Sequence, residues 1–429
     1  MSLFTRAKAE EQPATPEPAA EPSFLPGAPE ADANGLRSIE AHRDYLVSHA
    51  ESLHPFGIGL LDAAGLTLCE AIVADLDLPT FTAATTDGWA VRASNLVGAS
   101  PLRQVTLPVV DEIEAGGYRG APLTPGTAVR VAAGAPVPEG ADAVVPEAAG
   151  VVEGEDVRFS AEARFQQYLR PAGSRVSDGD QLLAKGTKLT PRALALIAEV
   201  GYDKVLARPR PRVVVLTADS ALVEPGLPLT RLTESYDACT TLLTASARED
   251  GAQAFPAGIV PAESGPLART IAEQLVRADL LLLVTEVTEE LLAMLGRIGT
   301  IDVAEVDGLP GRQVFALVGE DRAPVLVLPP GPVPAYLAYV LFGRPLLRRL
   351  AGLDAGQPAR TTAPVIEELR PDPVRARLLL AHHTARGVSP VPADDPGAAE
   401  LATANSVIVL SPGADPVPPH GDVTCWLLD

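Results

Sequence analysis

Lysine is scarce in this 429-residue chain, and its distribution limits where anions can bind. The lysines are Lys8, Lys185, Lys188 and Lys204, so the second half of the sequence has none. An anion site in that half must therefore use arginine, backbone N–H groups or a metal ion. The formal net charge is -21. Because a phosphate backbone needs a basic surface, we expect no nucleic-acid partner.

Aromatic residues, cysteines and long apolar runs are also few. Aromatics make up 4% of the chain against 47% apolar residues, so Leu, Val and Ala must form most of the cores. Cys69, Cys239 and Cys425 are widely spaced, which is typical of free buried thiols in a reducing compartment. The sequence has no apolar run of membrane-spanning length and no signal-peptide core. We therefore expect a cytoplasmic protein without membrane insertion.

The first half of the chain consists of segments with different predicted structure. Residues 1–36 are rich in Pro, Ala and Glu and are expected to be disordered. Their composition does not distinguish a plain extension from a tether or a partner-binding arm. Ser38 is expected to cap a helix, and residues 66–164 have the short, Val-rich, turn-punctuated pattern of a β-rich unit. Thr190 and Pro191 then open a second helix.

Apolar strands and amphipathic helices alternate from residue 212 onward. The expected strands are 213–216, 258–260, 280–284, 314–318 and 325–328, and the expected helices are 237–248, 266–277 and 332–350. Strands this apolar imply a parallel sheet covered on both faces. Pro345 should kink the last helix. The Pro-rich residues 357–429, with short strands such as 406–410, indicate a small separate β unit.

The most informative motif is residues 134–145 (GAPVPEGADAVV). Pro136 and Pro138 fix the backbone, and Gly140 then permits a tight turn before a strand. Other distinctive segments are 77–79 (DLP), 86–92 (TDGWAVR), 222–226 (LVEPG), 236–237 (YD) and 342–346 (FGRPL). In their order and spacing they resemble the signatures of the molybdopterin molybdenumtransferases, the MoeA-like proteins that correspond to the E domain of gephyrin. The resemblance covers residues 37–429.

This resemblance implies a multidomain, elongated α/β plus β-rich subunit. Its expected parts are a disordered tail (1–36), a discontinuous helical domain (37–74 and 165–203), an inserted β-rich domain (75–164), a three-layer α/β domain with a parallel-rich sheet (204–352) and a small β-barrel-like domain (353–429). It also implies a homodimer, with the active cleft between the inserted domain of one subunit and the α/β domain of its partner.

The resemblance further implies a reaction and the residues that perform it. The family inserts molybdate into adenylyl-molybdopterin with Mg²⁺ and releases AMP. The implied catalytic residue is Asp87, and the implied substrate-binding residues are Arg170, Tyr236, Asp237, Gly311 and Arg312. Metal ligands are left open. For Asp87 the alternative is turn chemistry, since Asp-Gly is a common turn pair.

Many positions that would touch ligand depart from the family pattern. Ala133 stands in place of Thr, Ser174 and Arg175 in place of an acidic pair, Asp219 in place of Gly, Ser220 and Ala221 in place of another acidic pair, and Arg312 in place of Lys. Residues 286–291 (EVTEEL) replace a glycine-rich loop and are typical of a helix start with acidic residues in its first turn. Scaffold prolines, turn glycines and apolar strands persist. This one-sided pattern predicts weakened or lost catalysis.

Two functions therefore remain. The whole-length resemblance assigns a molybdopterin molybdenumtransferase, and this is the formal prediction. The replaced ligand residues favour, on physical grounds, a catalytically inactive gephyrin-like dimeric scaffold that binds protein partners, for example in cell division. A regulatory ligand-binding module is a third class, for which the sequence offers no positive feature.

Overall fold

The computed structural model describes residues 23–117, 120–393 and 395–428. It divides into two compact units, which are Met1–His54 with Pro209–Asp429 (the sheet unit) and Pro55–Arg208 (the inserted unit). The mixture of an α/β unit and β-rich parts confirms the predicted fold class. The finer division into five parts stays a prediction. Within the described residues, no helix is long and apolar enough to cross a membrane.

An eight-stranded sheet organises the sheet unit. Its order is β1 (Ser23–Phe24), β20 (Gly299–Val306), β21 (Arg312–Val318), β22 (Ala323–Leu328), β19 (Leu280–Val284), β15 (Arg212–Ala218) and β18 (Gln253–Val260), with β2 (Leu36–Arg37) also on β20. Strands β18, β15, β19 and β22 run parallel, whereas β21 is antiparallel to both neighbours. The tight turn between β21 and β22 allows only an antiparallel pair, so the sheet is mixed.

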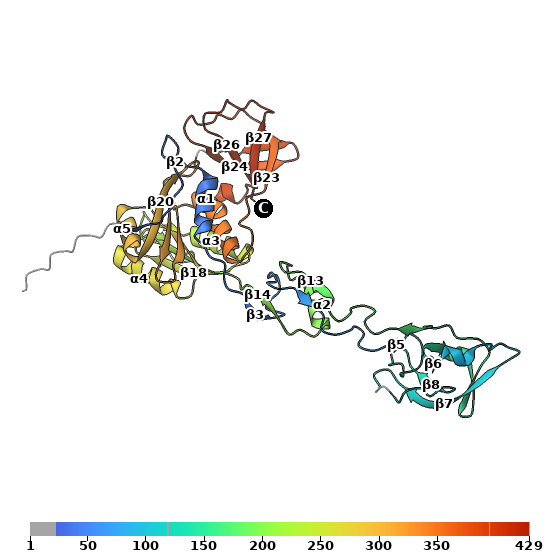
Figure 1. Ribbon diagram of the computed structural model, residues 1–429. Helices are drawn as coiled ribbons and strands as arrows, with labels where there is room; N and C mark the ends of the chain where they lie inside the picture. The colour runs from blue at the N-terminus through green and yellow to red at the C-terminus, as the bar shows by residue number, and fades with distance from the viewer. Residues whose placement is uncertain (1–22, 118–119, 394, 429) are drawn as a thin grey trace, which may run out of the picture. The chain divides into compact units, whose positions relative to one another are not determined.

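Helices cover both faces of this sheet, as Figure 1 shows. Alternate strand residues point to opposite faces. One face packs on α1 (Ile39–Ser48), α3 (Cys239–Glu249), α6 (Pro332–Ala338) and α7 (Arg344–Leu350). The other face packs on α4 (Ser264–Leu275) and α5 (Glu289–Ile298). The predicted three-layer α/β arrangement is confirmed, and the expected helices lie within two residues of their predicted starts.

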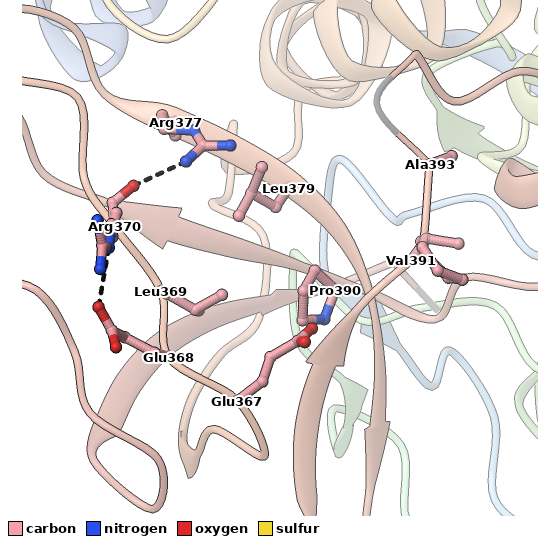
Figure 2. Close-up of a pocket in the computed structure, with 10 residues that line it drawn as sticks. Glu367, Glu368, Leu369, Arg370, Arg377, Leu379, Pro390, Val391 and Ala393 are labelled. Atoms are coloured by element: carbon pink, nitrogen blue, oxygen red, sulfur yellow. Dashed lines mark hydrogen bonds and ion pairs between the residues drawn. The ribbon is translucent and has the colours of Figure 1, made fainter.

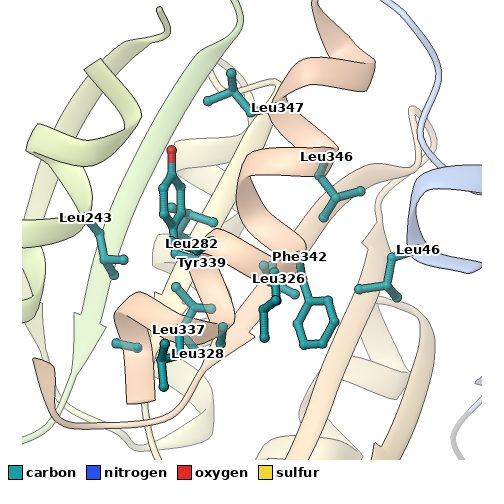
Figure 3. Close-up of a cluster of buried hydrophobic side chains, with 14 of the residues drawn as sticks. Leu46, Leu243, Leu282, Leu326, Leu328, Leu337, Tyr339, Phe342, Leu346 and Leu347 are labelled. Carbon is teal, nitrogen blue, oxygen red and sulfur yellow. The ribbon is translucent and has the colours of Figure 1, made fainter. Parts of the chain in front are cut away.

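The predicted kink before Pro345 takes the form of a π-helical turn. Tyr339–Gly343 forms a π-helix (η3) between α6 and α7. Pro345 has no N–H for the usual helical bond to Leu341, so the helix widens by one residue there. Tyr339 and Phe342 consequently point into the large core beside the sheet, among the leucines drawn in Figure 3.

Two sequence predictions differ from the structure. Residues 1–22 lie outside the described residues, but residues 23–36 of the predicted tail are ordered: β1 pairs with β20, and Leu25 is 4% exposed. The Pro-rich composition of residues 1–36 gave no sign that Phe24 and Leu25 belong to a short apolar segment on the sheet. Strand β18 is longer than the predicted 258–260, because Pro256 lies at the sheet edge, where its missing N–H costs no ladder bond.

The C-terminal part of the sheet unit is a five-stranded antiparallel sheet. Its order is β23 (Arg360–Pro364), β27 (Asp422–Leu427), β26 (Ser406–Leu410), β24 (Arg377–Thr384) and β25 (Gly387–Pro390), with the short α8 (Ala398–Leu401) before β26. Leu380, Val407 and Trp426 join the large core, and the opposite face has its own apolar cluster. This sheet therefore packs on the rest of the sheet unit through one face.

The inserted unit is β-rich. Its six-stranded sheet has the order β10 (Gly150–Glu153), β11 (Asp156–Phe159), β7 (Val105–Ile113), β8 (Ala128–Val131), β6 (Gly88–Val91) and β9 (Ala143–Pro146). Short pairs are β3 (Phe56–Gly59) with β14 (Lys204–Ala207), β4 (Ile72–Val73) with β13 (Gln181–Leu183), and β5 (Ala83–Ala84) with β12 (Leu169–Arg170). The helices are η1 (Ala93–Leu96), η2 (Glu147–Ala149) and α2 (Pro191–Glu199), which Thr190 caps as predicted.

A buried ion pair holds β2 and β20 together. Arg37 Nη1 lies 2.9 and 2.7 Å from the two carboxylate oxygens of Asp302, and the side chains are only 11% and 4% exposed. His42 of α1 is fully buried beside this pair, with its Nδ1 3.8 Å from Asp302. Neither ring nitrogen of His42 has a hydrogen-bond partner among the described residues. The core therefore contains a paired Arg37 and Asp302 beside an imidazole ring that makes no hydrogen bond.

Removal of Arg37 should destabilise the sheet unit strongly. Arg37→Ala leaves the Asp302 carboxylate buried and unpaired, which should lower the free energy of unfolding by about 3–5 kcal/mol in urea denaturation. The matched control is Arg370→Ala, which removes an ion pair whose two side chains are 78% and 47% exposed. It should cost less than about 1 kcal/mol. Equal effects of the two variants would contradict the account.

His42 should make stability depend on pH. Burial, followed by the charge of Arg37, lowers the pKa of His42 to about 3. Below pH ~6.5 His42 is protonated in the unfolded chain but stays neutral in the folded chain. The free energy of unfolding therefore decreases by about 1.4 kcal/mol for each unit by which the pH is lowered. Urea denaturation of wild type and His42→Leu between pH 7.5 and 4.5 should therefore diverge. Parallel stability curves for the two proteins would show that His42 does not contribute.

Candidate functional site

The carboxyl ends of parallel strands meet at one edge of the sheet, where α/β proteins commonly bind ligands. At this strand-end edge, Asp219 follows β15, Glu286 lies just beyond β19, and Pro329 follows β22. Tyr236 and Asp237 precede α3, and Gly311 and Arg312 lie where β21 begins. Strands β15 and β21 are three strand spacings apart, about 14 Å. The sequence-predicted residues thus share an edge but form two separate groups.

Asp237 serves as the N-terminal cap of α3. Its side chain is buried, with the residue 3% exposed. One carboxylate oxygen accepts from Thr240 N at 3.0 Å, and the other accepts from Thr240 Oγ1 at 2.5 Å. Thr240 Oγ1 also lies 2.8 Å from Thr217 Oγ1. The carboxylate therefore lies at the positive end of the helix and bonds to its first turn.

The loop between β15 and α3 is held by its own side chains. It contains the short parallel pair β16 (Leu222–Val223) and β17 (Ser235–Tyr236). Asp219 accepts from Ala221 N at 2.7 Å, and the Tyr236 hydroxyl donates to Leu227 O at 3.0 Å. The Arg231 guanidinium, together with backbone N–H groups, lowers the pKa of Glu234 to about 2. The loop is therefore braced without a ligand.

Arg312 braces the start of α5. Its guanidinium donates to Glu289 Oε1 at 2.7 Å and to Val287 O at 3.1 Å. Thr288 caps the helix by accepting from Leu291 N at 3.1 Å. Residues 286–291 thus form the predicted acidic helix start. The charge of Arg312 is neutralised by Glu289, although the pair stays partly exposed beside a hollow of 480 Å³.

The N-terminus of α6 offers few donors. Gly331 has a φ of 98°, and Pro332 and Pro334 have no N–H, so two of the first three helical donors are missing. The Cys239 thiol of α3 lies close in space, within reach of the Gly331 backbone N–H, and burial raises its pKa to about 11. The edge therefore provides neither an anion cradle at α6 nor a thiolate at Cys239.

Asp87 and Arg170 both belong to the inserted unit. Asp87 lies in the turn between β5 and β6, and Arg170 pairs with Ala83 in the ladder of β5 and β12. Asp87 Oδ1 accepts from Ala133 N at 2.8 Å, which joins this turn to the residue that precedes the 134–145 motif. Among the described residues, the Arg170 side chain has no hydrogen-bond or ion-pair partner. Asp87 thus has a structural role and keeps one carboxylate oxygen exposed.

Sequence reasoning missed two exposed aromatic residues next to Arg170. Phe165 and Tyr168 are 71% and 46% exposed. The available signal was the segment 164–170 (RFQQYLR), in which arginines and aromatic residues alternate with polar residues in an acidic, aromatic-poor chain. The described residues show no group of three or more His, Cys, Asp or Glu side chains that could hold a metal ion.

A larger hollow lies away from these residues. It has a volume of 610 Å³ and lies in the C-terminal sheet, where Arg370 bonds to Glu368 and Arg377 bonds to the carbonyl of Arg370 (Figure 2). Its lining comes from residues 367–370, 377, 379 and 390–393. None of the sequence-predicted site residues lines this hollow.

Asp237 should prove essential to structure. Asp237→Ala leaves Thr240 N and its hydroxyl without their acceptor, which should cost about 1–2 kcal/mol of unfolding free energy in urea denaturation. Asp219→Ala, which removes only a bond within an exposed loop, is the matched comparison and should cost less than about 1 kcal/mol. An unchanged stability of Asp237→Ala would show that this carboxylate is free to serve a ligand.

Similarity to known proteins extends along the chain. The model of the MoeA N-terminal region (domain I and II) matches residues 37–201. Molybdopterin molybdenumtransferase 1 of Mycobacterium tuberculosis is 30% identical over 419 residues, covering 89% of this chain and 96% of the relative. Molybdopterin molybdenumtransferase 2 of the same organism is 30% identical over 389 residues, covering 87% and 95%.

Solved structures support the same fold. Two crystal structures of a molybdopterin biosynthesis MoeA protein from Pyrococcus horikoshii have TM-scores of 0.77 and 0.61, with 22% and 21% identity. They cover 92% and 91% of this chain, and 99% and 100% of their own. At this identity the structural likeness speaks for the fold alone. Taken with the relatives of 30% identity matched over nearly their whole length, it shows that this chain belongs to the molybdopterin molybdenumtransferase (MoeA) family.

Proposed function

We propose that this chain is a molybdopterin molybdenumtransferase-like protein of molybdenum cofactor biosynthesis in which insertion of molybdate into adenylyl-molybdopterin is slow or lost. Membership of the MoeA family supports a role in molybdenum cofactor biosynthesis. The proposed loss of molybdate insertion rests on one observation. The polar side chains at the strand-end edge hydrogen-bond to nearby backbone groups and to each other. Asp237 caps α3, Asp219 closes its own turn, and Arg312 braces α5.

The charge at this edge opposes anionic substrates. Asp219 stands where an anion would need a glycine, and Glu286 is exposed beyond β19. An anion 4 Å from one such carboxylate is destabilised by about 1–4 kcal/mol, depending on the local dielectric. The cations described at this edge, Arg231 and Arg312, are already paired with Glu234 and Glu289. A phosphate group therefore gains little at this edge.

Asp87 and Arg170 are the groups still placed to act on a substrate. Arg170 is exposed and can donate to phosphate oxygens, and the second carboxylate oxygen of Asp87 can orient a polar group or a substrate-borne cation. We propose a cytoplasmic homodimer, in which these residues face the strand-end edge of the partner subunit. Adenylyl-molybdopterin and molybdate are the proposed substrates, and any Mg²⁺ would arrive with the substrate phosphates.

A dimeric scaffold for protein partners is the second candidate. It is favoured by the contrast between intact apolar cores in both units and a strand-end edge that satisfies its own polar groups. A protein selected only to present its surface needs the cores but not an open edge. The scaffold candidate requires no anion binding, so the two candidates differ in a measurable property.

Activity can be tested directly by complementation. In a host lacking its own transferase, we expect this chain to restore only a few per cent of the molybdoenzyme activity given by the Mycobacterium tuberculosis relative. Calorimetric titration with adenylyl-molybdopterin should show correspondingly weak binding. Asp219→Gly should tighten that binding several-fold, because it removes a repelling carboxylate and a Cβ. Asp321→Gly, in the turn at the opposite end of β21, is the matched control and should change nothing. Full restoration by the wild-type chain would overturn the proposal.

A further inference from the structure

A small pocket in the sheet unit is lined by two arginines and by no carboxylate. It has a volume of 240 Å³ and lies between α7, residues 355–359 and Leu427 of β27. Its charged lining residues are Arg344 and Arg348, which are four residues apart and therefore lie on one face of α7. The two larger hollows, by contrast, have glutamates in their lining. In a chain with a net charge of -21, this pocket is therefore a candidate site for an anion.

Each of the two guanidinium groups is held through its Nε atom. Arg344 Nε donates to Asp250 at 2.9 Å, and the same carboxylate oxygen accepts from the Tyr339 hydroxyl at 2.6 Å. Arg348 Nε donates to the Asp354 carbonyl at 2.7 Å. Within the described residues, the terminal nitrogens of both arginines make no hydrogen bond. Neither Asp250 nor Asp354 lines the pocket, so a ligand there would meet positive charge.

The segment that closes the pocket contains further unpaired donors. The backbone N–H groups of residues 355–357 make no hydrogen bond within the described part of the chain. Gly356 has a φ of 70° and approaches α7 so closely that a Cβ there would lie 3.2 Å from Arg348 Nε. Successive backbone N–H groups beside guanidinium groups are a common arrangement for binding an oxyanion.

The helix dipole does not account for this arrangement. A cation in the last turn of a helix stabilises its negative end, and both Arg348 and Arg349 are placed to do so. Arg349, however, is exposed, donates to the Ala50 carbonyl at 3.1 Å and does not line the pocket. The dipole thus explains why arginines occur there, but it requires no enclosed space between Arg344 and Arg348.

The pocket is remote from the strand-end edge. The helical run of α6, η3 and α7 is continuous from Pro332, which lies just beyond β22, to Leu350. At about 1.5 Å per residue, Arg348 lies roughly 24 Å along this run from Pro332. A ligand in the pocket would therefore not occupy the strand-end edge, and binding there is independent of the proposed function.

We propose that this pocket binds inorganic phosphate and that the bound anion fastens the C-terminal sheet to α7. The guanidinium groups of Arg344 and Arg348 donate to the phosphate oxygens, and the dianion offsets their adjacent charges. The volume of 240 Å³ is below the ~300–1,000 Å³ of pockets for larger ligands, so a small anion is favoured over a nucleotide. Because the lining comes from α7, from β27 and from residues 355–359 between them, the anion stabilises their packing.

The test is calorimetric titration of the full chain with sodium phosphate at constant ionic strength. Arg348→Gln should weaken phosphate binding about tenfold or more, because it removes charge-assisted hydrogen bonds. Gln357→Glu adds a carboxylate to the lining and should weaken binding to a similar extent. Acetate, which carries one charge, should bind at least tenfold more weakly than phosphate.

Hydrogen–deuterium exchange tests the structural effect of the anion. Phosphate should slow exchange severalfold in residues 351–359 and in β27 of the wild-type chain, but not in Arg348→Gln. Phosphate also stabilises proteins generally, because it is excluded from their surface. A comparison of the two proteins at the same phosphate concentration removes that contribution.

Matched controls keep the same chemistry outside the pocket. Arg349→Gln removes an arginine from the same turn of α7, and Gln181→Glu adds a carboxylate at an exposed position of β13. Both should bind phosphate within twofold of wild type.

Four results would overturn the proposal. They are equal phosphate affinity of wild type and Arg348→Gln, an equal loss of affinity in Arg349→Gln, acetate binding as tight as phosphate binding, and tighter binding of glycerol 3-phosphate than of inorganic phosphate. Phosphate titration needs no molybdate insertion, so complementation by this chain, or its failure, leaves the phosphate site standing.

Discussion

Burial of both faces of the eight-stranded sheet is the constraint on which the rest of the structure depends. Strands β15, β19 and β22 are almost wholly apolar, so helices must cover each face. The parallel strands that result place their carboxyl ends along one edge. The residues that follow these strands leave the covered faces of the sheet and gather at that edge. They are therefore the residues of these strands and loops that are open to a ligand.

The polar side chains at this edge form hydrogen bonds within the protein. Asp237 accepts a hydrogen bond from Thr240 N, and Asp219 accepts one from Ala221 N. Arg312 donates to Glu289 and to the Val287 carbonyl. Each bond stabilises a helix start or a loop. The chain thus keeps the fold of the MoeA family, and the polar groups at its strand-end edge are bonded within the protein. The inserted unit differs, because Arg170 and the rings of Phe165 and Tyr168 remain exposed.

Much of the fold was predictable because it follows from local patterns. Apolar runs predicted the parallel strands, Ser38 and Thr190 marked helix starts, and Pro345 marked the kink. The antiparallel β21 was not predictable in this way, since its apolar sequence suits either direction and only the tight turn to β22 decides. Of the candidate site residues, Arg170 lies in the ladder of β5 and β12, and Asp87 lies in the turn that follows β5. The cap formed by Asp237 was not foreseen, because a motif identifies a carboxylate without showing which donors reach it.

The most direct measurement is a crystal structure of the full chain grown with adenylyl-molybdopterin and molybdate. The account predicts that Asp237 remains on Thr240, that Arg312 remains on Glu289, and that no phosphate lies at the amino ends of α3, α5 or α6. It also predicts that ligand density, where present, lies beside Asp87 and Arg170. A phosphate or molybdate bound along the strand-end edge, with Asp237 or Arg312 turned toward it, would contradict the claim that this edge has closed on itself.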